Sequence, residues 1–202
     1  MSRARSSMSV AGADAQTEFV IRPATAADAD AIAMLHADSW LTAYRGILSD
    51  EYLDDAMRAE RQRIWRERLA RPKPGQIVLV APGNGKLAGF VCLFTRYGAL
   101  SHSYIDNLHV APRLHGKGLG RMLMVAVAHA IPETEASLPV SLTVFEANRG
   151  ACAFYDAVGG VVGERLMEIE ADGRRLPTLR YVWDNAQALI EGATLPWKRP
   201  AG

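Results

Sequence analysis

The sequence has few cysteines and forms no pattern typical of a disulfide or metal framework. Its 202 residues include only Cys92 and Cys152, and these make neither a CxxC pair nor a Cys/His ligand spacing. We therefore expect no metal, and we predict a reducing, cytoplasmic location. A chain of this length can bury enough surface to fold without such cross-links.

Long apolar runs and net charge are also lacking. The most apolar run, Met122 to Ile131, is about half the length that a bilayer span requires, which argues against a membrane segment. The formal net charge of +1 gives no overall attraction for nucleic acid or an acidic membrane. Residues 1–16 carry Arg3 and Arg5 but no apolar core of a secretory signal.

The distribution of the charges is uneven. Residues 107–132 contain no acid, whereas residues 14–60 contain ten acids and three arginines, a local formal charge of −7. A basic region suits a phosphate-bearing ligand, and an acidic region suits a cationic one. Near-neutrality is therefore an average over two regions of opposite sign.

Periodicity and breaker residues predict the elements in the order β-α-α-β-β-β-α-β-α-β-β. Thr25 and Asp28 form a capping box that begins the first helix, and Pro82 to Gly85 form a hairpin turn. This order favours an α+β (mixed α/β) fold over strict alternation. The expected strands are 19–22, 76–81, 87–95, 103–110, 140–145, 161–170 and 176–183, and the expected helices are 25–37, 49–69, 119–130 and 149–158.

No linker or repeat divides the chain, so we expect one domain over residues 18–183. Residues 1–17 are expected to form a mobile N-terminal tail. Residues 184–202, which contain Gly192 and two prolines, are expected to form a C-terminal tail.

A strand that leads through a glycine-rich turn into an apolar helix carries the strongest functional signal. Gly116, Gly118 and Gly120 fall within five positions, immediately before and within the start of the helix. Glycine lets a ligand approach the main chain closely, and unpaired N–H groups at a helix N-terminus attract anions. Arg113, Lys117 and Arg121 add positive charge, so the segment predicts a pyrophosphate site.

Two common phosphate-binding motifs do not fit this turn. A P-loop requires Ser or Thr after its lysine, whereas Lys117 is followed by Gly118. A dinucleotide fingerprint that starts at Gly116 would require glycine at the position of Arg121. A dehydrogenase-type nucleotide domain is therefore disfavoured.

The motifs resemble those of the GNAT (GCN5-related N-acetyltransferase) superfamily. Residues 113–118 match its (Q/R)xxGxG/A signature, and Leu108 and Val110 occupy the strand before it. Asn148 and Tyr155 are similar to the family's next motif. Across residues 18–183, the resemblance implies the GNAT fold, a central mixed, mostly antiparallel sheet of about seven strands. This sheet would splay between its fourth and fifth strands and be flanked by about four helices.

The resemblance implies acetyl-CoA as cosubstrate and a direct transfer of the acetyl group to an amine. The strand before the turn would bind pantetheine, the glycine turn would bind pyrophosphate, and Asn148 and Tyr155 would contact the pantetheine arm and the sulfur. The implied cosubstrate residues are Leu108, Val110, Arg113, His115, Gly116, Lys117, Gly118, Gly120, Arg121, Asn148 and Tyr155.

The chemistry requires a base and an acid. An alkylamine with a pKa of about 10.4 is almost fully protonated at pH 7, so a group must take a proton before the attack. Asp106 and His109 are the two candidate bases on this strand, and water or another residue is the alternative. In a regular strand they lie on opposite faces, which a bulge would change. Tyr155 is the candidate acid that protonates the thiolate, whereas Cys152 is interpreted as a core residue rather than a nucleophile.

The acceptor would be a primary amine of a small molecule or a peptide. His36, Trp40 and Tyr44 recur at helical spacing in the region that walls the acceptor pocket in the family. This stripe faces either the core or the cleft, and core packing is favoured for Trp40. A non-catalytic acyl-CoA-binding or regulatory module on the same fold is the alternative function. Homodimer formation is left open.

Overall fold

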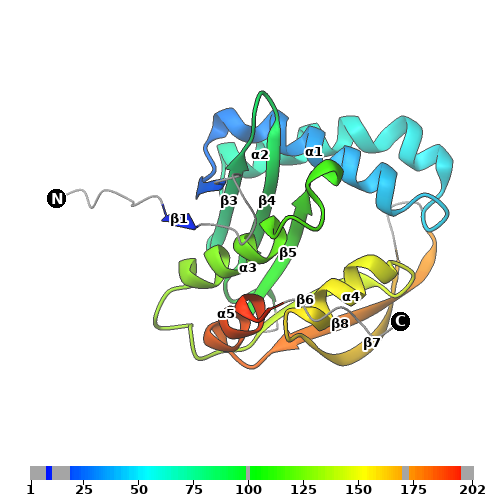
Figure 1. The fold of residues 1–202 in the computed structure, drawn as a ribbon. Coiled ribbons are helices and arrows are strands. Elements are labelled where there is room, and N and C mark those ends of the chain that lie inside the picture. Colours follow the sequence, from blue (N-terminus) through cyan, green and yellow to red (C-terminus); the bar gives the residue numbers. More distant parts are fainter. Residues whose placement is uncertain (1–7, 11–18, 99–100, 170–172, 197–202) are drawn as a thin grey trace.

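The protein forms an α+β fold in which one twisted sheet carries helices on both faces (Figure 1). The computed structural model describes residues 8–10, 19–98, 101–169 and 173–196. The strands are β1 (Met8–Val10), β2 (Phe19–Pro23), β3 (Gln76–Pro82), β4 (Leu87–Phe94), β5 (Ser103–Val110), β6 (Val140–Phe145), β7 (Val161–Ile169) and β8 (Arg175–Trp183). The α-helices are α1 (Ala29–Ala43), α2 (Met57–Ala70), α3 (Leu119–Ala130), α4 (Arg149–Ala157) and α5 (Ala186–Thr194).

The described part of the sheet has the strand order β1-β2-β3-β4-β5-β6-β8-β7. Its pairs are antiparallel except for β5 with β6, which run parallel. The predicted mixed, mostly antiparallel sheet is therefore confirmed. Strand β1, which pairs Met8 with Ile21, adds one strand to the seven that the sequence predicted. The rest of the predicted N-terminal tail lies outside the described residues.

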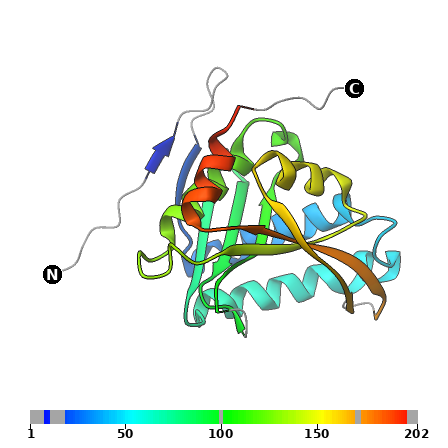
Figure 2. The same cartoon turned by 90° about the horizontal axis from the view of Figure 1, so that it is seen from below.

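Two layers of helices cover the sheet. Helices α1 and α2 lie on one face, and α3, α4 and α5 lie on the other (Figures 1 and 2). Leu123 and Val127 of α3 are buried in the larger core, while Trp65 of α2 packs with Phe90 of β4 in the second core. Strand β4 is buried along its whole length because it lies between both layers, which explains its continuous apolar sequence.

Helix α5 is an element that the sequence pattern did not predict. Asn185 caps its N-terminus by accepting a hydrogen bond from the Ala188 N–H at 2.8 Å, and Leu189 is fully buried in the larger core. Asn185 is the kind of N-cap that could have identified this helix. The folded part of the chain therefore extends past the predicted boundary at residue 183. The end of the predicted C-terminal tail, residues 197–202, and Glu170 of a predicted strand lie outside the described residues.

Candidate active site

Strands β5 and β6 separate to form a wedge in the sheet. They pair at Ser103 with Val140 and at Tyr104 with Ser141, and no further pair follows among the described residues. These are the fourth and fifth strands of the predicted sheet, so the expected splay is confirmed. The Tyr104 and Thr143 hydroxyls are 2.7 Å apart and hydrogen-bond across the closed end of the wedge.

The free edge of β5 faces into this wedge with open main-chain groups. The Ala111 N–H donates to the Ala88 carbonyl on β4 at 2.8 Å, and Val110 is paired with Gly89 in the same ladder. Because main-chain groups in an antiparallel ladder alternate in direction, the N–H groups of Leu108 and Val110 point away from β4. The Val110 carbonyl lies 3.0 Å from Nε2 of His115. The predicted pantetheine strand thus offers unpaired donors on the expected side.

The glycine turn places an open, positively polarised surface at the start of α3. Gly118 is the N-cap residue with a φ of +83°, and Gly116 has a φ of +75°. A Cβ at either position would meet no atom within 4 Å. The first-turn N–H groups of α3 have no partner within the helix, and they carry the positive end of its dipole. Together with exposed Arg113 and Lys117, the turn fits a phosphate group.

Arg121 has a structural role in addition to the one predicted. Its guanidinium donates to the carbonyls of Ala157 at 2.8 Å, Ala193 at 3.0 Å and Leu195 at 3.0 Å. These carbonyls end α4 and α5, where a cation stabilises a helix C-terminus. The side chain therefore ties α3 to two other helices. Its main-chain N–H lies in the first turn of α3, where the sequence predicts a phosphate contact.

Gly120 also serves helix packing. A Cβ at Gly120 would lie 3.2 Å from the Phe154 ring of α4, so glycine allows α3 and α4 to approach each other. Its N–H group still belongs to the first turn of α3. A ligand can therefore contact the main-chain N–H of Gly120, whereas the space next to its Cα is filled by the Phe154 ring.

Helix α4 brings Asn148 and Tyr155 to the other side of the wedge. Asn148 is the N-cap of α4, and its Oδ1 accepts from the Ala151 N–H at 3.2 Å, which leaves its amide N–H groups for a ligand. Tyr155 is buried against Tyr181 and Trp183. Burial, followed by the nearby Tyr44 hydroxyl, raises the pKa of Tyr155. The phenol therefore stays protonated at neutral pH and can donate a proton.

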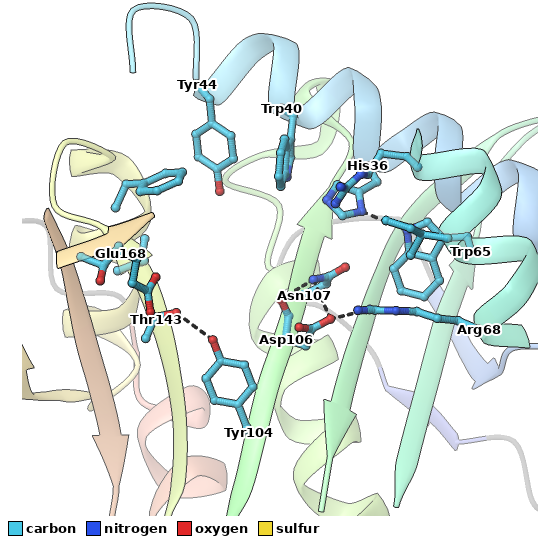
Figure 3. Close-up of a pocket in the computed structure, with 15 residues that line it drawn as sticks. His36, Trp40, Tyr44, Trp65, Arg68, Tyr104, Asp106, Asn107, Thr143 and Glu168 are labelled. Atoms are coloured by element: carbon cyan, nitrogen blue, oxygen red, sulfur yellow. Dashed lines mark hydrogen bonds and ion pairs between the residues drawn. The ribbon is translucent and has the colours of Figure 1, made fainter. Parts of the chain in front are cut away.

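A cavity of about 240 Å³ lies between α1, α2 and the open part of the sheet (Figure 3). His36, Trp40 and Tyr44, the three residues predicted for the acceptor pocket, all line it. Asp106 and Asn107 face Thr143 and Glu168 across the cavity. The other lining residues are Arg61, Ile64, Trp65, Arg68, Tyr104, Val144, Phe145 and Thr178.

The sequence pattern missed the lining residues from α2, β7 and β8. Arg61 and Arg68 reach the cavity from α2, Glu168 reaches it from β7, and Thr178 reaches it from β8. These residues are far from the recognised motifs, and no local spacing identified them. Glu168 brings a second carboxylate to the cavity in addition to Asp106.

A β-bulge places Asp106 in the cavity. Cys92 pairs with Asn107 and Leu93 pairs with Ile105, so Asp106 is the extra residue between them. Its carboxylate forms a half-buried ion pair with Arg68 of α2 and accepts a hydrogen bond from Asn107 Nδ2 at 3.1 Å. His109 contacts His36 of α1, and α1 and α2 cover the same face. The bulge therefore places Asp106 and His109 on the same face of the sheet, as the sequence predicts for an irregular strand.

The His109 ring is packed against His36 and Phe90. Its ring centroid lies 4.5 Å from that of His36 and 5.1 Å from that of Phe90. Burial, and secondarily Arg61, lowers the pKa of His109 to about 3. His109 is neutral at physiological pH, and it is not among the residues that line the cavity. Of the two candidate bases, only Asp106 reaches the cavity.

The described residues contain neither a metal-type cluster nor a helix of membrane-spanning character. Within the described ranges, no group of three or more His, Cys, Asp or Glu side chains is arranged to hold a metal ion. None of the helices in that part of the chain has the length and apolarity needed to cross a membrane.

Comparisons with known proteins point to one family. The model of the acetyltransferase (GNAT) family matches residues 37–159. Among solved structures, PaiA N-acetyltransferase from Thermoplasma acidophilum in complex with coenzyme A is similar, with a TM-score of 0.62, 21% identity, and coverage of 80% of this chain and 98% of that chain.

Two further structures share the fold. A GCN5-related N-acetyltransferase from Rhodopseudomonas palustris has a TM-score of 0.61 and 24% identity, and the match covers 80% of this chain and 92% of that chain. YncA from Salmonella typhimurium with its cofactor acetyl-CoA has a TM-score of 0.58 and 18% identity, with coverage of 83% and 94%. None of the curated proteins matches the chain in sequence.

Proposed function

Because this chain belongs to the GNAT acetyltransferase family, we propose that it is an N-acetyltransferase that uses acetyl-CoA. The acetyl group passes directly to a primary amine of a small molecule or a peptide within a ternary complex. One observation carries the proposal: the wedge between β5 and β6 has open main-chain donors along β5 and opens beside a cavity that contains Asp106. Both substrates can meet there.

The acetyl-CoA side of the proposal rests on three groups of residues. The main chain of Leu108 pairs with a pantetheine amide, as a free sheet edge pairs with an added strand, and the Val110 N–H binds the thioester carbonyl at the end of the arm. The turn at Gly116 and Gly118 binds the pyrophosphate through N–H groups, with Arg113, Lys117 and His115 around it. Asn148 donates from its amide to the pantetheine arm. Acetyl-CoA supplies the activated acetyl group and the thiolate leaving group.

The residues of the chain then handle the protons of the reaction. Asp106 takes a proton from the ammonium group, directly or through water, and the neutral amine nitrogen forms a bond to the thioester carbon. The Val110 N–H, which faces the wedge, stabilises the oxyanion, and one such donor is typically worth about 3 kcal/mol. The C–S bond breaks as Tyr155 gives its proton to the thiolate, and the nitrogen passes its second proton through water to the Tyr155 phenolate, which restores the phenol.

The volume of the cavity limits the size of the acceptor. Its volume of about 240 Å³ is below the roughly 300 Å³ at which drug-sized sites begin, so a small amine or a single peptide end enters it.

Both cysteines are free and buried. This agrees with the proposed cytoplasmic location, where thiols stay reduced.

Ligand-dependent stabilisation tests the proposal. Acetyl-CoA and CoA at about 100 times Kd are expected to stabilise the protein by about 2.7 kcal/mol, a rise in Tm of roughly 5–10 °C. NADH and ATP are expected to give no shift. Stabilisation by NADH without stabilisation by acetyl-CoA would overturn the proposal.

Release of free thiol from acetyl-CoA in the presence of a panel of primary amines measures acetyl transfer. Tight CoA binding with no thiol release for any amine would favour a non-catalytic acyl-CoA-binding module.

Substitution of Gly118 by alanine is expected to weaken acetyl-CoA binding by about tenfold, equivalent to ~1.4 kcal/mol. The added Cβ would enter the open space above the turn, where the phosphate approaches. Isothermal titration calorimetry measures the change in Kd.

Gly85 provides the matched control for this substitution. It has a φ of +74°, and a Cβ there also meets no atom within 4 Å. Gly85→Ala therefore adds similar backbone strain, since L residues disfavour a positive φ, but in the β3–β4 turn. Equal affinities of the two variants for acetyl-CoA would show that the Gly118 turn does not bind the phosphate.

A further inference from the structure

The cavity contains buried polar atoms that have no hydrogen-bond partner within the described part of the chain. They are His36 Nε2, Arg61 Nε, Asn107 Oδ1 and Thr178 Oγ1. An unpaired buried polar group is costly, and native structures contain few of them. His36 is 2% exposed, so its ring is held in place beside the cavity. These atoms indicate the hydrogen-bonding pattern of the molecule that the cavity accepts.

His36 offers a fixed donor. The Trp65 Nε1–H, which can only donate, gives its hydrogen bond to His36 Nδ1 at 3.0 Å. Nδ1 is therefore unprotonated, and the hydrogen of the neutral ring is on Nε2. Burial, followed by the neighbouring His109, Arg61 and Arg68 side chains, lowers the pKa of His36 well below its usual value. The ring therefore does not gain a second proton at neutral pH.

Asn107 offers a fixed acceptor. Its Nδ2 donates to both the main-chain carbonyl and the carboxylate of Asp106. Both partners are acceptors, so the amide must direct its NH₂ group at them, which leaves Oδ1 as the unpaired atom. The preceding residue is the candidate base, and the amide is therefore held next to it.

The donor and the acceptor lie side by side. His36 stacks on His109 with a centroid distance of 4.5 Å, and Asn107 is two residues before His109 on the same face of β5. Figure 3 shows Asn107 between His36 and Asp106 at one wall of the cavity. A ligand group at this wall must accept a hydrogen bond from His36 and donate one to Asn107.

We propose that His36 and Asn107 form a subsite for a neutral hydroxyl or carboxamide on the acceptor amine. The inference rests on the proposed function and names the class of acceptor: an amino alcohol or an amino amide. A carboxylate cannot donate to Asn107 Oδ1, and an ammonium group cannot accept from His36 Nε2. Simple amino acids, diamines and alkylamines therefore each leave one or both atoms unpaired.

Binding of matched amines in the presence of CoA tests the subsite. The probes are 1-amino-2-propanol, its apolar isostere isobutylamine and its cationic isostere 1,2-diaminopropane. Kd is measured by NMR titration at about pH 5, because the first ammonium group lowers the pKa of the second amine and the diamine is doubly protonated only in acid. We expect 1-amino-2-propanol to bind at least about tenfold more tightly than either isostere, because a site built for a hydroxyl discriminates against analogues that lack it. Equal Kd values, or tighter binding of the diamine, would overturn the inference and assign these atoms to water.

Variants identify the residues responsible. Asn107→Leu is expected to remove the preference for 1-amino-2-propanol, whereas Asn84→Leu, a matched change in the exposed β3–β4 turn, is expected to keep it. His36→Phe provides a second variant, and the Tm shift with CoA verifies that each variant folds. A preference that survives in Asn107→Leu and His36→Phe would contradict the subsite. Because this comparison measures amine binding, it remains informative even if no amine releases CoA and the proposed function fails.

Discussion

Replacement of Asp106 by asparagine is expected to lower kcat/KM for the amine acceptor by about 10²- to 10⁴-fold, the usual contribution of a general base. Asp106 is the candidate base that lines the cavity, whereas His109 is not among the lining residues and burial lowers its pKa to about 3. Asparagine keeps the size of the side chain but cannot take the proton. Thiol release measures the rate, and the Kd for acetyl-CoA is expected to stay unchanged, because the cosubstrate residues are elsewhere on the wedge.

Asp30→Asn is the matched control. Asp30 pairs with Arg66 of α2 at 2.7 Å, so its substitution also removes a carboxylate partner of an α2 arginine, but outside the cavity. We expect this variant to keep wild-type activity. Activity of Asp106→Asn within about twofold of the wild type would place the base elsewhere, at water, His109 or Glu168.

Substitution of Gly192 by alanine is expected to destabilise the fold by about 3 kcal/mol or more, at the upper end of overpacking effects. A Cβ at Gly192 would lie 2.2 Å from the Val158 carbonyl oxygen and 3.1 Å from the Gly159 Cα. Both atoms belong to the main chain, so they cannot rotate away as a side chain does. Thermal unfolding is expected to show a Tm roughly 6–12 °C below that of the wild type.

Loss of the α5 packing is also expected to disturb the glycine turn before α3, because Arg121 of α3 donates to the Gly192 and Ala193 carbonyls of α5. Gly150→Ala is the control: its Cβ would lie 4.0 Å from the nearest atom, Asn148 Oδ1, on a helix where alanine is favoured by up to about 1 kcal/mol. Gly150→Ala is expected to be neutral or stabilising. Equal stability of the Gly192→Ala variant and the wild type would mean that α5 does not pack on the Val158 turn as described.

Local patterns predicted most of the fold because they depend on neighbouring residues. The capping box at Thr25 forms, with the Thr25 N–H donating to Asp28 at 2.7 Å, and the left-handed conformations of Gly116 and Gly118 follow from the absence of a Cβ. Helix α5 was missed because its apolar stripe is only nine residues long and is stabilised mainly by tertiary packing.

The candidate site could be predicted only in part. The helical spacing of His36, Trp40 and Tyr44 placed three side chains on one stripe of α1, and all three line the cavity. The partners of Asp106 and Arg121 could not be predicted, because Arg68 and the α5 carbonyls are 38 and 71 or more residues away along the chain. Their contacts depend on how whole elements pack.

The sequence by itself determined the order of the elements from β2 to β8, the glycine turn before α3 and the family to which its motifs point. These are properties of short segments, set by local conformational preference and by the period of apolar residues. The tertiary structure decided which side chains share the cavity. The register of β4 against β5 creates the bulge at Asp106, and strand register is a property of a pair of strands. That pairing brought the Asp106 carboxylate into the cavity that Asn107 and His36 also line. Of the two candidate bases on β5, Asp106 is the one that lines the cavity.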